Sequence, residues 1–115
     1  MRVNIDTQFA TYPAYEEGIQ FSMEGMGKYG NITRYKNIRK EMGGLLFDLQ
    51  RSCSTGSAEK QVHYLFLALR HLDNLEMEIR LSSENEELIR LELVQEKIRS
   101  LKTMITGYIQ HLKEG

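Results

Sequence analysis

The chain has 115 residues, of which 41% are apolar and 27% are charged, with 15 Lys and Arg against 16 Asp and Glu. These proportions are typical of a globular domain and exclude a disordered chain, which is less apolar, and an integral membrane protein, which is less charged. One cysteine cannot form an internal disulfide framework or a thiolate zinc site. No apolar run approaches the roughly 18 residues that cross a bilayer, and the N-terminus lacks the apolar core of a signal peptide. We therefore expect one cytosolic domain over residues 1–115, with no membrane association.

The first 31 residues predict an arm, a short helix and a loop. Residues 1–10 are interpreted as the arm, and Pro13 suits the first turn of the helix. Its expected apolar face consists of Tyr12, Tyr15, Ile19, Met23 and Met26. Three glycines in six positions place the loop at residues 27–31, and Asn31 is a suitable N-cap for the next helix. These glycines also match the pattern Gly-x-Gly-x-x-Gly, but no strand precedes them, so a loop is favoured over a phosphate-binding site.

The next predicted helix carries an apolar stripe through Ile38, Met42, Leu45 and Leu49. Two adjacent glycines, at positions 43 and 44, interrupt it, and each costs about 1 kcal/mol relative to alanine inside a helix. Two explanations are open: a neighbouring helix approaches closely there, or the backbone of a partner lies against the glycines. The polar tract at 52–56 should end the helix, with Cys53 as a small apolar residue in its last turn.

From residue 57 to the end, apolar residues recur at spacings of three and four, which predicts two long helices. Ser57 is a suitable N-cap for the first, and Ser83 with Glu86 forms a capping box for the second. The expected apolar faces are Val62, Leu65, Leu69, Leu72, Leu75 and Ile79, then Leu88, Leu91, Val94, Ile98, Leu101, Ile105, Tyr108 and Leu112. Brief connections between these segments predict an all-α, up-and-down antiparallel four-helix bundle with a short first helix.

No local pattern indicates catalysis, a cofactor or a metal. A nucleophile needs an oriented base beside it, and Cys53 has no such neighbour in the sequence. Glu59 and His63 are at most half of a metal site, because di-iron bundles use Glu-x-x-His twice. His63, His71 and His111 are expected at the surface or at an interface. We therefore expect a protein that is not an enzyme and that has no cofactor.

Charge is unevenly divided along the chain. Residues 73–96 hold eight acids against two arginines, whereas residues 28–40 hold no acid and five basic residues, namely Lys28, Arg34, Lys36, Arg39 and Lys40. A basic helix start beside Tyr29 and Tyr35 is typical of contact with single-stranded nucleic acid through charge and base stacking. Two alternatives are open: a solvated face, or a basic patch that meets the acidic stretch of another subunit.

Apolar residues outside the main stripes favour self-association. They widen the apolar surface of the last two helices beyond what one neighbouring helix covers, and they are Phe66, Met77, Leu93, Met104 and Ile109. Part of this surface should enter the bundle core, and the remainder would form an exposed strip of the kind that marks subunit contacts.

Three segments resemble helices of one family of small bacterial and phage four-helix bundles. They are RYKNIRKEM with LLFDLQRS at 34–52, LFLALRHLDNLE with IRL at 65–81, and EKIRSLKTMITGYI at 96–109. The family comprises the accessory variability determinants of diversity-generating retroelements, together with related bundles encoded in intervening sequences of ribosomal RNA genes. The resemblance covers residues 32–112.

This resemblance implies a non-enzymatic, ring-shaped pentamer that binds a reverse transcriptase and its template RNA. On this interpretation, the candidate nucleic-acid or polymerase contacts are Arg34, Lys36, Arg39, Lys40 and Arg51. The related ribosomal-intervening-sequence bundles imply an alternative, a structural or protein-interaction bundle that binds no nucleic acid.

Overall fold

The computed structural model describes residues 13–29, 36–82 and 88–114, which form four helices. These are α2 (Pro13–Tyr29), α3 (Lys36–Ser54), α4 (Ala58–Ser82) and α5 (Leu88–Glu114). The all-α four-helix prediction is confirmed, and α2 is the shortest helix with 17 residues against 19 in α3. The predicted arm at 1–10, the Asn31 cap and the Ser83 capping box lie outside the described residues.

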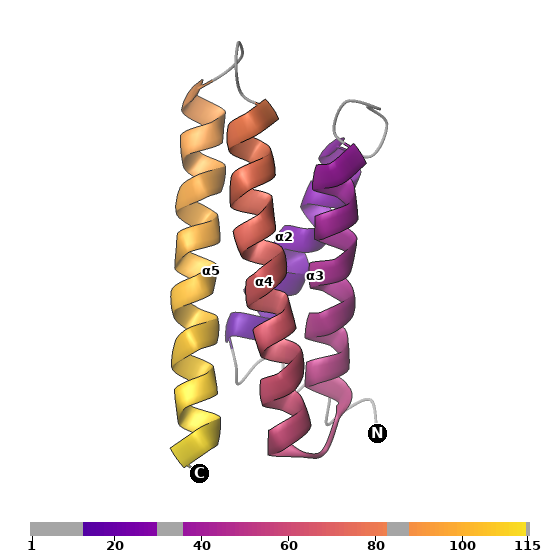
Figure 1. The fold of residues 1–115 in the computed structure, drawn as a ribbon, viewed down its shortest axis with the longest axis vertical. Helices are drawn as coiled ribbons and strands as arrows, with labels where there is room; N and C mark the ends of the chain where they lie inside the picture. Colours follow the sequence, from indigo (N-terminus) through magenta and orange to yellow (C-terminus); the bar gives the residue numbers. More distant parts are fainter. Residues whose placement is uncertain (1–12, 30–35, 83–87, 115) are drawn as a thin grey trace.

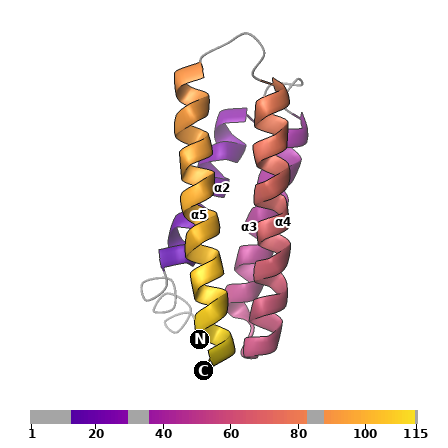
Figure 2. The same cartoon turned by 60° about the vertical axis from the view of Figure 1, so that its left-hand side comes forward.

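The helices pack in a ring, with α3 and α5 each lying between α2 and α4 (Figure 1). Polar contacts between opposite ends of neighbouring helices establish the antiparallel order. Tyr15 near the start of α2 contacts Ser52 near the end of α3, and Asn37 at the start of α3 contacts Glu78 near the end of α4. Figure 2 shows α2 inclined to the three other helices. No helix within the described ranges has the length and apolar content needed to cross a membrane.

The described members of the predicted apolar stripes of α3, α4 and α5 pack into the core. Their fully buried side chains are Ile38, Met42, Leu45, Leu49, Leu65, Leu72, Leu75, Ile79, Ile98, Leu101 and Ile105. Phe66, Met77 and Leu93 are exposed, as expected for residues outside the stripes. Ile109, however, is buried, and Met104 packs against the core. These two are the part of the wider apolar surface that enters the core, since α5 contacts both α2 and α4.

Small residues bring α2 close to α3. Gly18, Ser22 and Gly25 are buried, and a Cβ on Gly18 would lie 2.6 Å from Leu49 Cδ1. The predicted loop at 27–31 is wrong for residues 27–29, which are helical, while residues 30 and 31 lie outside the described part. At least Gly25 therefore serves close packing rather than a turn. Because the buried side of α2 follows the small residues, Met23 is exposed, although its position was assigned to the core face.

The connection between α3 and α4 is nearly as predicted. Helix α3 ends at Ser54, within the tract predicted to end it, and buries Cys53 in its last turn. Ser57 caps α4, since the Lys60 backbone N–H donates to Ser57 Oγ at 3.3 Å. The Gln61 backbone N–H also donates to the Ser57 carbonyl at 2.9 Å.

Candidate nucleic-acid interface

One side of α3 presents cations to solvent near both ends of the helix. Lys36, Lys40, Gly43, Phe47 and Arg51 follow each other at spacings of four, three, four and four, which places them on one face of the helix. We call this set the α3 outer face. All its members except Gly43 are exposed, and Gly43 is half-buried. The set spans about 22 Å at 1.5 Å per residue, and α3 forms one edge of the molecule in Figure 1.

The structure brings together three of the five sequence candidates. Lys36 and Lys40 lie in the first two turns of α3 and Arg51 in its last turn, on the same face. Arg39 is half-buried and lies beside this line rather than on it. Arg34 lies outside the described residues.

Two aromatic rings contact the guanidinium of Arg51. Its guanidinium carbon lies 5.6 Å from the centre of the Phe47 ring and 5.6 Å from that of the Tyr64 ring on α4, within cation–π range. Arg51 Nη2 also donates to Tyr64 Oη at 3.4 Å. Tyr29 and Tyr35, the stacking residues predicted from the sequence, are not tested, because Tyr35 and the side chain of Tyr29 lie outside the described part of the chain. Phe47 was not predicted, although its spacing of four from Arg51 is a signal for it.

Both acids of α3 point away from the outer face, toward α4. His71 of α4 lies between them, with Nδ1 2.7 Å from Glu41 Oε1 and Nε2 3.0 Å from Asp48 Oδ2. Asn74 Nδ2 also donates to Glu41 at 3.3 Å. Burial raises the pKa of Asp48, and the neighbouring His71 opposes that rise. The two ring nitrogens of His71 therefore join both acids of α3 to α4.

The two glycines of α3 have different surroundings. A Cβ on Gly44 would overlap the His71 ring and lie 2.6 Å from Nε2, so Gly44 makes room for the imidazole. The close-approach explanation is therefore confirmed for Gly44. It is wrong for Gly43, where an added Cβ would meet no atom within 4 Å. His71, expected at the surface or at an interface, is half-buried between α3 and α4 of its own chain.

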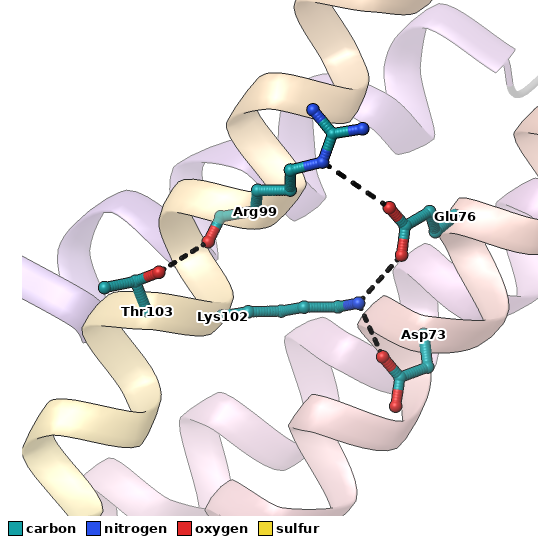
Figure 3. Close-up of polar contacts among 5 residues, drawn as sticks. All are labelled: Asp73, Glu76, Arg99, Lys102 and Thr103. Atoms are coloured by element: carbon teal, nitrogen blue, oxygen red, sulfur yellow. Dashed lines mark hydrogen bonds and ion pairs between the residues drawn. The ribbon is translucent and has the colours of Figure 1, made fainter.

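Part of the acidic stretch is neutralised within the chain (Figure 3). Lys102 of α5 lies 2.6 Å from Asp73 and 2.8 Å from Glu76 of α4, and Arg99 Nε lies 3.9 Å from Glu76. The hydrogen bond from Lys102 lowers the pKa of Glu76. These two acids therefore bind α5 to α4. This observation weakens the alternative in which the acidic stretch meets the basic patch of another subunit.

The buried polar groups have structural roles. Tyr15 Oη donates to Ser52 Oγ at 2.6 Å, and Ser52 donates in turn to the Gln61 carbonyl at 2.9 Å. These bonds join the start of α2, the end of α3 and the start of α4. Burial raises the pKa of the Cys53 thiol to about 11, which agrees with its expected role as an apolar residue.

One open groove among the described residues has a volume of about 260 Å³. It lies between α2 and α5 and is lined by Phe21, Glu24, Gly25, Met42, Leu93, Val94 and Lys97. Among the residues placed by the structure, no three His, Cys, Asp or Glu side chains are grouped to hold a metal ion. The α3 outer face is therefore the strongest candidate site.

In comparisons with known proteins, no family model matches this chain, and no curated protein or solved structure is significantly similar to it. The resemblance given above is thus a hypothesis from the residues themselves.

Proposed function

We propose that the protein is a non-enzymatic accessory subunit that binds RNA through the α3 outer face and serves the reverse transcriptase of a diversity-generating retroelement. The observation that supports RNA binding is the charge of this face, where Lys36, Lys40 and Arg51 are exposed. Both acids of the same helix, Glu41 and Asp48, are held against His71 instead. Such a row of cations suits a phosphate backbone.

Local charge matters here because the whole chain carries a formal net charge of −1. Exposed charges farther apart than about 8–10 Å are largely screened at physiological salt. The α3 outer face is about 22 Å long, which is more than twice this screening distance. A strand bound along it would therefore interact mainly with the cations of this face and less with charges elsewhere on the chain. The paired acids Asp73 and Glu76 contact α5, which is not a neighbour of α3 in the ring.

Two parts of the proposal, the reverse transcriptase as partner and the ring of five subunits, depend on the resemblance alone. The described helices also expose large apolar side chains by 49–65%, and each helix carries at least one: Met23, Phe47, Phe66, Met77, Leu81 and Leu93. Light scattering on the purified protein would measure the subunit number.

Binding of fluorescently labelled single-stranded RNA across a salt series tests the proposal. Each phosphate contact to a single strand contributes about 0.7 to the slope of log affinity against log salt, so replacing Lys36, Lys40 and Arg51 with Ala should reduce the slope by about 2. A variant with Ala at Arg70, Arg80 and Lys113 has the same net charge change on α4 and α5 and serves as the control. Equal losses in both variants, or none, would remove the α3 outer face from the proposal.

Genomic context and co-purification test the partner. A neighbouring reverse transcriptase gene with paired variable and template repeats, and co-purification of that enzyme with this protein, would support the accessory role. A ribosomal RNA locus and no RNA affinity would instead favour the structural or protein-interaction bundle.

A further inference from the structure

We propose that the α3 outer face selects unpaired RNA over duplex RNA, by stacking an exposed base at Phe47 while the strand passes over Gly43. This inference rests on the proposed function and specifies its ligand. It depends on the arrangement of Phe47, Arg51, Tyr64 and Gly43 rather than on charge alone.

Phe47 is placed as a stacking residue. It is 56% exposed, and cations lie on both sides of it along the helix, Lys40 before it and Arg51 after it. The Arg51 guanidinium is held over Phe47 and also faces Tyr64, so three flat groups are gathered at one point. Aromatic rings and guanidinium planes are the groups on which unpaired bases stack, while neighbouring cations bind the backbone.

At Gly43 the helix surface between Lys40 and Phe47 carries no side chain. An added Cβ would meet no atom within 4 Å, so no neighbouring helix requires a glycine here. Alanine would favour the helix more strongly. Two explanations were open for the glycine pair, a neighbouring helix or the backbone of a partner. For Gly43 the close approach of a partner backbone remains. A strand that contacts Lys40 and stacks at Phe47 passes over this position.

Single-stranded RNA fits this face better than duplex RNA or a second copy of the chain. A duplex keeps its bases stacked inside and offers mainly phosphates and 2′-hydroxyls, which leaves Phe47 without a partner. A second copy would have to present acids to the face. Two of the acids in the acidic stretch, Asp73 and Glu76, are engaged by Lys102 in their own chain.

The experiment compares a short labelled oligouridine with an RNA duplex of the same length, using fluorescence anisotropy on the full chain. Stacking one base contributes enough that Phe47→Leu should weaken oligouridine binding by roughly 5- to 150-fold. Duplex binding should not change, and Phe47→Trp should retain oligouridine binding. The matched control is Phe66→Leu, because Phe66 is 49% exposed and has Lys113 5.5 Å from its ring centre, but lies on the α4–α5 side. It should bind like the wild type.

Gly43→Ala provides a second, independent measurement. It should weaken oligouridine binding while raising the melting temperature measured by circular dichroism, so a loss of affinity cannot come from unfolding. Unchanged oligouridine affinity in both Gly43→Ala and Phe47→Leu would overturn the inference.

The outcomes separate this inference from the proposed function. If the Lys36, Lys40 and Arg51 variant loses both RNAs but Phe47→Leu loses neither, the face binds phosphates without stacking, and only the inference fails. If the wild type binds neither RNA, both proposals fail. If the charge variant instead lowers the molecular mass measured by light scattering and RNA is not bound, the face is an interface between copies, which overturns the inference.

Discussion

Replacing each glycine of the adjacent pair in α3 with alanine should change stability in opposite directions. Gly43→Ala places a methyl group in open space, whereas Gly44→Ala places it inside the His71 imidazole. Since both changes improve intrinsic helix propensity equally, the difference between them reports the packing of His71 against α3.

The magnitude follows from the contacts. Gly43→Ala should gain up to about 1 kcal/mol in the free energy of unfolding, the helix propensity difference. In Gly44→Ala the His71 ring must move away from the α3 backbone, which breaks at least one of its contacts to Glu41 and Asp48. A hydrogen bond to a charged group contributes about 1.5–3 kcal/mol, so after the propensity gain Gly44→Ala should be less stable than the wild type by about 0.5–2 kcal/mol.

Urea denaturation followed by circular dichroism measures both variants, and His71→Ala completes a double-mutant cycle. With the imidazole removed, Gly44→Ala should regain most of the stabilisation seen for Gly43→Ala. If Gly44→Ala stabilises the native chain as much as Gly43→Ala does, the imidazole does not pack on Gly44, and the explanation of this glycine is refuted.

Three other predictions concern the pair Asp48 and Glu76, the pair Tyr15 and Ser52, and Cys53. The pKa of Asp48 is raised in the folded protein, so its contribution to stability is present below its ordinary pKa of 3.8 and is lost as pH rises through its folded pKa. The pKa of Glu76 is lowered, so its contribution is present above its ordinary pKa of 4.5 and is lost as pH falls through its folded pKa. Asp48→Asn and Glu76→Gln should therefore alter the pH dependence of the unfolding free energy with opposite signs, as urea titrations between pH 3 and 7 would measure. Tyr15→Phe should cost about 1 kcal/mol in thermal or urea unfolding, whereas Ser52→Ala should cost more, since it leaves both the Tyr15 hydroxyl and a backbone carbonyl without this partner. Cys53, buried and with a pKa of about 11, should react with a thiol reagent only as fast as the protein opens, and rapid labelling of the native protein would contradict its burial.

The sequence predicted the helices well because the core residues of α4 and α5 recur at spacings of three and four without a breaker. It was less accurate for α2, where the buried side consists of small residues such as Gly18 and Ser22. A search for apolar periodicity does not recognise such residues as part of a buried face. Their packing is visible only when Leu49 and Met42 of α3 are placed against them.

The candidate site could be predicted only in part. Helical spacing already places Lys36, Lys40 and Arg51 on one face, but it does not show which face is solvent-exposed. Nor could it reveal that Tyr64, thirteen residues after Arg51, contacts it from the next helix. The contacts of His71 depend likewise on the register of α4 against α3, which sequence periodicity leaves open.

The same helix register that buries the core also separates the charges of α3. Glu41 and Asp48 are seven residues apart, with Gly44 between them, so all three lie on the side of α3 that faces α4. His71 can contact both carboxylates only because Gly44 has no side chain in its way. The opposite side of α3 is consequently left with Lys36, Lys40 and Arg51, and a chain with a net charge of −1 gains a cationic surface. The packing of one imidazole thus supports the charge pattern on which the proposed RNA contact depends.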